Sequence, residues 1–183
     1  MNRNQLVTYL ERIDAALRNE AVLYIYGSAA FILLDEPERT SLDVDVAAPY
    51  CRLDERAFRD AAARAGLPVN PEPDTTGDHI EWISSLRLCL PKPSADTDIV
   101  LWQGHHLTVK TGAIPALIAS KLVRYDVVDR SDVQYLLSQH SVAFHDVAAA
   151  VRSLPPPFNQ DAVVLDNLEN FRTDMALWIG SQA

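Results

Sequence analysis

An alternation of acidic and apolar residues, LDVDV at positions 42–46, limits this stretch of the chain to few local structures. Side chains alternate across a β-strand, so Asp43 and Asp45 would share one face while Val44 and Val46 occupy the other. Aspartate is disfavoured in strands, and two neighbouring carboxylates on one face repel each other unless a cation lies between them. The stretch therefore predicts a half-buried strand whose acidic face is either simply hydrated or a site for a divalent cation.

Size and composition indicate an ordinary globular protein. The chain has 183 residues, of which 48% are hydrophobic, enough for one compact domain or for a small domain with a helical extension. No apolar stretch reaches the length of a membrane span, the polar start does not resemble a signal peptide, and two cysteines show no paired spacing. We therefore expect a cytoplasmic protein with no membrane partner. The net charge of −9 argues against non-specific binding of nucleic acid by the whole surface.

Hydrophobic periodicity predicts an α+β first part, residues 1–112, followed by a helical part, residues 113–183. Ser28 is expected to cap a short helix, Gly66 to close another, and Pro115 to lie in the first turn of a third. Helices are expected over 2–19, 29–34, 53–66, 114–125, 130–139, 144–153 and 160–178. Strands are expected over 21–27 and 42–48, followed by two or three strands within 79–90, 97–102 and 106–110.

The pair Gly27-Ser28 follows a predicted strand and opens a predicted helix. Backbone N–H groups at such a turn, together with the serine hydroxyl, are able to hold a phosphate group. The alternative is an ordinary helix cap and turn glycine with no ligand.

Charged residues lie on the inward-facing sides of two predicted C-terminal helices. Lys121 stands at the edge of an apolar stripe, and Asp129 and Asp132 share a face with apolar residues of the next helix. A buried ammonium needs an anionic partner. Either Lys121 pairs with one of these aspartates and locks the two helices, or it reaches the phosphates of a nucleotide while an aspartate orients it. Both roles are compatible.

Two stretches in the same order resemble the nucleotidyltransferase superfamily. They are YGSAAFILL…ERTSLDVDV, within residues 26–46, and ALIASKLVRYDVVDRSDVQYLL, residues 116–137. The pattern is similar to that of AbiEii-type toxins and related bacterial nucleotidyltransferase-like proteins. The resemblance implies an α+β fold with a small mixed β-sheet flanked by helices, followed by a C-terminal helical part.

The resemblance also implies an activity: Mg²⁺-dependent transfer of an NMP group from an NTP to a hydroxyl of an RNA or a protein. It further implies a toxin that is paired with an antitoxin protein. By position, the metal ligands would be Asp43 and Asp45, the triphosphate would lie at Gly27 and Ser28, and the later lysine and helical acids would be Lys121, Asp129 and Asp132.

The chain departs from the pattern at two places. Superfamily enzymes bring a third carboxylate beside the aspartate pair, and the candidates here are Asp98, which we take as the third metal ligand, and Glu81. The arginine expected just before Asp129 is replaced by Val128, and Arg130 follows instead. An alternative function is therefore a catalytically impaired nucleotidyltransferase fold that serves as an antitoxin-like or regulatory binding module.

A third hypothesis is a structural homodimer. In it the C-terminal helices would bury Phe171, Met175 and Trp178 against a second copy of the chain.

Overall fold

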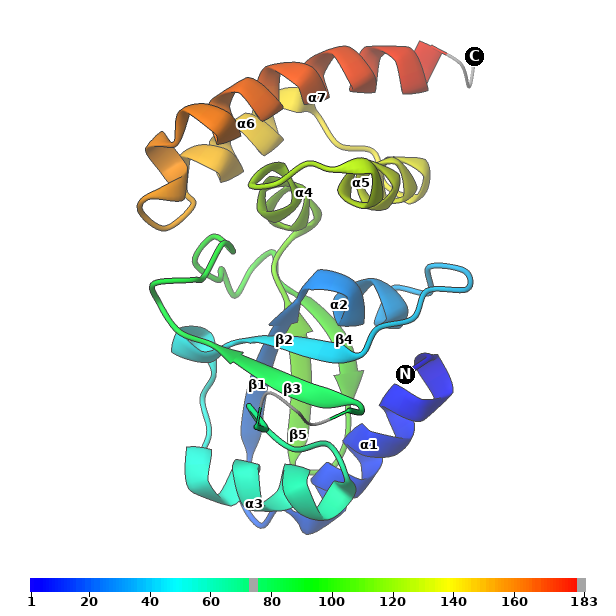
Figure 1. Cartoon of the computed structure of the whole chain (residues 1–183), viewed down its shortest axis with the longest axis vertical. Coiled ribbons are helices and arrows are strands. Elements are labelled where there is room, and N and C mark those ends of the chain that lie inside the picture. The colour runs from blue at the N-terminus through cyan, green and yellow to red at the C-terminus, as the bar shows by residue number, and fades with distance from the viewer. Residues whose placement is uncertain (73–75, 181–183) are drawn as a thin grey trace. The chain divides into compact units, whose positions relative to one another are not determined.

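The computed structural model describes residues 1–72 and 76–180 and divides into two compact units. The first, Met1–Arg87 with Ala95–Thr111, contains a β-sheet and three α-helices (Figure 1). The second, Leu88–Ser94 with the chain from Gly112 onward, is helical. The predicted α+β class, with a mixed sheet flanked by helices and followed by C-terminal helices, is confirmed.

The sheet unit is built on five strands in the order β3-β2-β1-β5-β4. Strand β2 pairs in parallel with β3 and β1 in parallel with β5, while β1–β2 and β4–β5 are antiparallel, so the sheet is mixed. The elements are α1 (Arg3–Ala16), β1 (Ala21–Tyr26), α2 (Gly27–Leu33), β2 (Asp43–Ala47), α3 (Glu55–Ala65), β3 (His79–Ile83), β4 (Ile99–Gln103) and β5 (Leu107–Thr111), with a 3-10 turn at Ala48–Tyr50.

One face of this sheet is apolar, and α1 and α3 lie against it (Figure 1). Val44 and Val46 of β2 are 2% and 0% exposed on this side, whereas Asp43 and Asp45 are only half-buried. The alternation of residues 42–46 therefore forms the one-sided strand that it predicts. The core on this side contains Leu6, Leu10, Ile13, Leu23, Ile25, Phe58, Ala61, Ala62, Ile80, Leu107 and Val109.

Helix ends follow local signals at most places. Gly66 ends α3 with φ +86°, a left-handed conformation that glycine adopts without steric cost, and Pro115 lies in the first turn of α4. Ser28 is an exception, because Gly27 already begins α2 and no side chain caps that helix, so the predicted cap is wrong.

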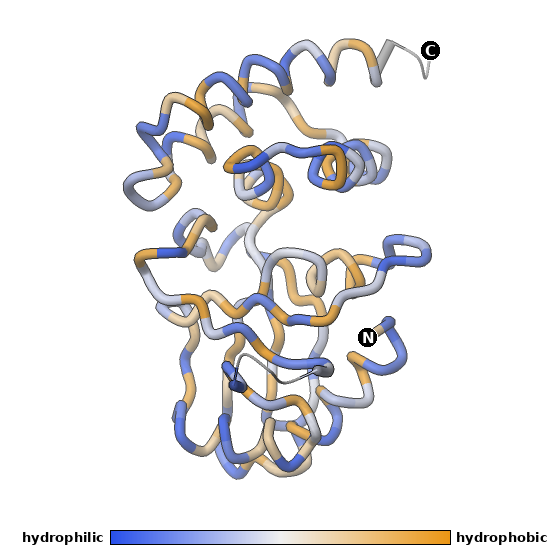
Figure 2. Tube along the Cα trace, in the orientation of Figure 1, coloured by the Kyte–Doolittle hydropathy of each residue, from blue (hydrophilic) through white to orange (hydrophobic). Residues whose placement is uncertain are grey.

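The helical unit contains α4 (Ile114–Leu122), α5 (Val127–Gln139), α6 (Phe144–Arg152) and α7 (Ala162–Gly180), with a 3-10 turn at Phe158–Gln160. Helix α5 begins three residues before its predicted start at 130, because the Asp126 carboxylate accepts the backbone N–H groups of Val128 and Asp129. Hydrophilic and hydrophobic residues alternate along these helices (Figure 2), as packing on one side requires.

The ring of Phe171 in α7 is buried inside the helical unit. It is 0% exposed and stacks on Phe144, with ring centroids 6.1 Å apart. Phe171 is therefore unavailable to a second copy of the chain, and that part of the homodimer hypothesis is wrong. Met175 and Trp178 are partly exposed.

The strand predicted over residues 79–90 is shorter than expected. It ends at Ile83, and Leu88 and Leu90 are buried in a segment that belongs to the helical unit. Among the described residues, none of the helices has both the length and the apolar character needed to span a bilayer.

A carboxylate at the end of α1 holds the turn between β4 and β5. Asp14 accepts the backbone N–H groups of His105, His106 and Leu107 at 3.0, 2.7 and 2.7 Å. The approach is close because Gly104 has no side chain: a Cβ there would lie 2.5 Å from the Asp14 carboxyl group. Partial burial raises the pKa of Asp14, but the three backbone hydrogen bonds and the charge of His106 outweigh it, so the pKa lies below its ordinary value.

We expect Asp14→Asn to lower the free energy of unfolding at pH 7 by about 1–3 kcal/mol, because an amide cannot replace a carboxylate that accepts three N–H groups. Since the folded-state pKa is depressed, this stabilisation is present above the ordinary aspartate pKa of about 3.9 and is lost as pH falls through the folded value. Urea unfolding from pH 7 to pH 3 measures both effects, and the variant should show a shallower decline. Glu11→Gln, exposed on the same helix, is the control; equal pH profiles for Asp14→Asn and wild type would contradict the account.

Candidate functional site

The polar face of the sheet carries the aspartate pair. Asp43 and Asp45 lie on β2 with side chains on one face, and the parallel register places His79 opposite Asp43 and Glu81 opposite Asp45. Residues paired in register share a face, so β3 adds a carboxylate to the acidic face of β2. Asp43 also accepts a hydrogen bond from the Ser41 hydroxyl at 2.7 Å, which fixes the orientation of its carboxylate.

The carboxylate of Asp45 lies directly against the turn that starts α2. Gly27 has φ +64°, and a Cβ built there would be 2.1 Å from Asp45 Oδ2, far inside any real contact. Glycine is required here twice, once for the left-handed backbone and once for the space that Asp45 occupies. The turn expected to meet a phosphate and the carboxylate expected to bind a metal are therefore adjacent.

An arginine reaches the same turn from the loop between α2 and β2. Arg39 Nη2 donates to Ser28 Oγ at 2.9 Å, and Arg39 Nε lies 3.8 Å from Glu36 Oε2. The sequence alone assigns no role to Arg39, although this residue belongs to the stretch ERTSLDVDV. The contact spans eleven residues and depends on the path of the loop, so no local pattern could have predicted it.

The two candidates for a third metal ligand make other contacts. Glu81 Oε2 lies 3.5 Å from Arg87 Nη2. Asp98 directly precedes β4, and two strands, β1 and β5, lie between β4 and β2 in the sheet. The Asp98 carboxylate accepts a hydrogen bond from Tyr24 Oη at 2.7 Å. Burial, together with this hydrogen bond and the Asp98 charge, raises the pKa of Tyr24 to about 12. Of the two, Glu81 is on the strand next to Asp45, and Asp98 is not.

The donor set of β2 nevertheless suits a magnesium ion. Within residues 1–72 and 76–180, no three His, Cys, Asp or Glu side chains converge on a metal-sized position, so neither Glu81 nor Asp98 completes such a group with Asp43 and Asp45. Mg²⁺ is usually held by one or two protein carboxylates together with substrate phosphates and water. Asp43 and Asp45 provide those two carboxylates, and the adjacent turn provides a place for phosphate.

The predicted ion pairs of Lys121 are confirmed, and both exist. Lys121 Nζ lies 2.5 Å from Asp132 Oδ2 and 3.3 Å from Asp129 Oδ1, and the three residues are 8%, 0% and 2% exposed. Lys121 comes from α4 and the two acids from α5, so the cluster joins these helices inside the helical unit. The structural reading of Lys121 is thus sufficient to explain its burial.

An arginine other than the one expected before Asp129 contacts this carboxylate. Arg124 donates to both carboxylate oxygens of Asp129, from Nε at 2.9 Å and from Nη2 at 3.0 Å. Arg130 instead donates to Asp174 of α7 at 2.7 Å, and Tyr125 Oη donates to the other oxygen of the same carboxylate at 2.8 Å. Asp129 therefore has its arginine partner in the turn that joins α4 to α5.

Comparison of the chain with protein-family models, with curated proteins and with solved structures finds no match in any of the three.

Proposed function

We propose that the sheet unit is the nucleotide-binding core of a Mg²⁺-dependent nucleotidyltransferase. The enzyme would transfer an NMP group from an NTP to a hydroxyl of an RNA or a protein, as the toxin of a toxin–antitoxin pair. The observation that carries this proposal is the position of the Asp45 carboxylate against Gly27, next to the Ser28–Arg39 contact. Groups that favour a divalent cation and groups that favour a phosphate lie side by side at one end of β1.

In this proposal Asp43 and Asp45 hold the metal, which would neutralise charge on the triphosphate during transfer. Gly27 and Ser28 position the phosphates. The acceptor oxygen forms a bond to the α-phosphorus while the bond to the β-phosphate bridging oxygen breaks, pyrophosphate leaves, and the hydroxyl proton passes to water. Catalytic roles for Lys121 and Asp132 rest on the resemblance alone. Of the two candidate third carboxylates, only Glu81 lies on the strand beside Asp45, and among the described residues neither forms a three-residue metal group with the aspartate pair.

The test is transfer of labelled NMP from an α-phosphate-labelled NTP to bulk tRNA or to protein. Asp43→Asn and Asp45→Asn should each reduce transfer by roughly a hundredfold or more, since a metal ligand contributes several kcal/mol to transition-state stabilisation. Neither change should lower the free energy of unfolding, because each removes repulsion between neighbouring carboxylates.

Asp60→Asn, at an exposed position of α3, is the matched control and should transfer like wild type. Wild-type transfer rates in Asp45→Asn would end the proposal. The variant panel should be assayed with each of the four NTPs.

One observation favours a second function, a nucleotide-binding module without transfer. Both candidate third acids contact other side chains, Glu81 the guanidinium of Arg87 and Asp98 the hydroxyl of Tyr24. A site with two carboxylates is sufficient to bind one Mg²⁺ with a triphosphate but lacks a ligand for a second ion. Binding of Mg²⁺–NTP without transfer to any acceptor is the result that distinguishes this module from the enzyme.

A further inference from the structure

Arg39 occupies an unusual position for a loop arginine. Its side chain is only 16% exposed, it donates to Ser28 Oγ, and its guanidinium carbon lies 5.9 Å from the centre of the Phe31 ring. The loop that carries it is mostly hydrophilic (Figure 2). The Arg39 side chain nevertheless contacts Ser28 at the start of α2. An arginine gives up hydration by doing so, which requires a compensating partner.

The backbone of this loop is held in a strained conformation. Asp35 and Glu38 have φ +64° and +58°, in the left-handed region that non-glycine residues seldom adopt. Backbone hydrogen bonds from Glu36 to Phe31 and from Arg39 to Glu36, at 3.1 and 3.4 Å, hold the loop against α2. Asp35 ends α2 as a left-handed helix cap, in which the N–H of Glu36 bonds to the Phe31 carbonyl, and this cap anchors the loop that carries Arg39.

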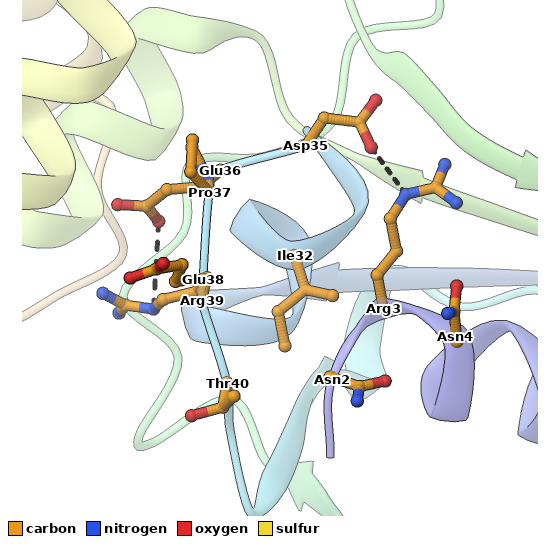
Figure 3. Close-up of a pocket in the computed structure, with 10 residues that line it drawn as sticks. All are labelled: Asn2, Arg3, Asn4, Ile32, Asp35, Glu36, Pro37, Glu38, Arg39 and Thr40. Carbon is orange, nitrogen blue, oxygen red and sulfur yellow. Dashed lines mark ion pairs between the residues drawn. The ribbon is translucent and has the colours of Figure 1, made fainter.

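A pocket of about 360 Å³ opens beside Arg39, and it gives a ligand access to the loop from solvent. Figure 3 shows Arg39 on one side of it, near Glu36, and Arg3 on the other, paired with Asp35. The contact between Arg39 Nε and Glu36 Oε2, at 3.8 Å, is longer than a hydrogen bond. An incoming anion would compete with Glu36 for the Nε side of the guanidinium.

Gly27-Ser28 is thus approached from two sides by groups of opposite charge, Asp45 at Gly27 and Arg39 at Ser28. A carboxylate and a guanidinium that contact two successive residues of one turn suit a ligand that combines a cation with an anion. A metal-bound triphosphate has this character, because its Mg²⁺ takes carboxylate oxygens while its phosphate oxygens take the planar N–H fork of arginine.

We propose that Arg39 is a direct phosphate ligand of the nucleotide, delivered to the Gly27-Ser28 turn by the loop over residues 35–40. This inference rests on the proposed function and adds a residue that sets affinity for the phosphate chain. Phosphate binding by Arg39 depends on the planar guanidinium with its several N–H donors, so a lysine at this position should bind phosphate more weakly.

The experiment is calorimetric titration of the full chain with inorganic tripolyphosphate and with ATP, each in Mg²⁺. Arg39→Met should weaken binding of both by roughly tenfold or more, because it removes charge-assisted hydrogen bonds to phosphate. Arg39→Lys should fall between Arg39→Met and wild type. Arg3→Met, at an exposed arginine of the same pocket, should change binding less than about twofold.

Loss of Arg39 leaves Glu36 without that cation, so folding needs its own control. Arg39→Met/Glu36→Gln should unfold at the wild-type urea concentration and still bind tripolyphosphate as weakly as Arg39→Met. If both Arg39 variants bind like wild type while Asp45→Asn loses the Mg²⁺ dependence, the inference is overturned and the proposed function stands. If wild type binds neither probe at millimolar concentration, the proposed function fails and the inference fails with it.

Discussion

Lys121→Met is expected to lower the free energy of unfolding by about 3–5 kcal/mol, the range found when one partner of a buried ion pair is removed. The ammonium lies between two almost fully buried carboxylates, and methionine has similar length but no charge. Arg124 still donates to Asp129 in the variant, so most of the lost stability comes from the Asp132 carboxylate, which loses its ammonium partner. Urea unfolding at pH 7 measures the difference.

Two further variants separate this effect from a general loss of packing. Adding Asp132→Asn to Lys121→Met should recover part of the stability, because the carboxylate that lost its ammonium is neutralised. Arg152→Met, exposed in the same unit, should change the free energy of unfolding by less than about 0.5 kcal/mol. A Lys121→Met protein as stable as wild type would show that the cluster is not structural and would favour a role for Lys121 at phosphates.

Gly27→Ala, which adds one methyl group beside Asp45, is expected to reduce both the stability of the protein and its nucleotide binding. The left-handed backbone at Gly27 costs alanine about 1–2 kcal/mol, and the new Cβ falls 2.1 Å from Asp45 Oδ2, so the carboxylate must move. We expect a loss of about 2 kcal/mol or more in the free energy of unfolding, together with loss of Mg²⁺-dependent nucleotide binding.

Gly66→Ala is the matched control for the backbone part of this effect. Gly66 also has positive φ, but a Cβ there meets only Tyr9 Cε1 at an ordinary 3.8 Å. The excess of Gly27→Ala over Gly66→Ala therefore reports the clash with Asp45, and that excess should vanish in an Asp45→Ala background. Equal losses for the two glycine variants in the wild-type background would contradict the close approach.

The general architecture was predictable because it depends on local patterns. The alternation at residues 42–46 produces a one-sided strand, and Gly66 and Pro115 mark helix ends by backbone geometry that few other residues share. Helix α3 lies between β2 and β3, a connection long enough for a parallel pair, which is how the two strands are arranged.

The contacts of the site were less predictable, because they join residues that are distant in sequence. Strand order decides which acid is next to Asp45, and the periodicity of a single strand contains no information about its neighbours. The sequence therefore gives no physical ground for choosing Asp98 over Glu81, and it is Glu81 that lies on the strand beside β2. Serine is a common helix-capping residue, but α2 already begins at Gly27, so Ser28 lies inside the helix. Its hydroxyl accepts a hydrogen bond from Arg39 instead of capping the helix. The position of Arg124 on Asp129 likewise depends on the turn after α4, where Tyr125 adopts φ +55°.

The most direct test of the metal–triphosphate site is calorimetry of a non-hydrolysable NTP analogue with wild type and Asp45→Asn, each in Mg²⁺ and in EDTA. If the acidic face of β2 holds the cation that carries the phosphates, wild type binds the analogue in Mg²⁺ and loses it in EDTA. Asp45→Asn should then bind the analogue weakly, with the same affinity in Mg²⁺ and in EDTA. Identical titrations for the two proteins, or no binding by wild type, would contradict the account.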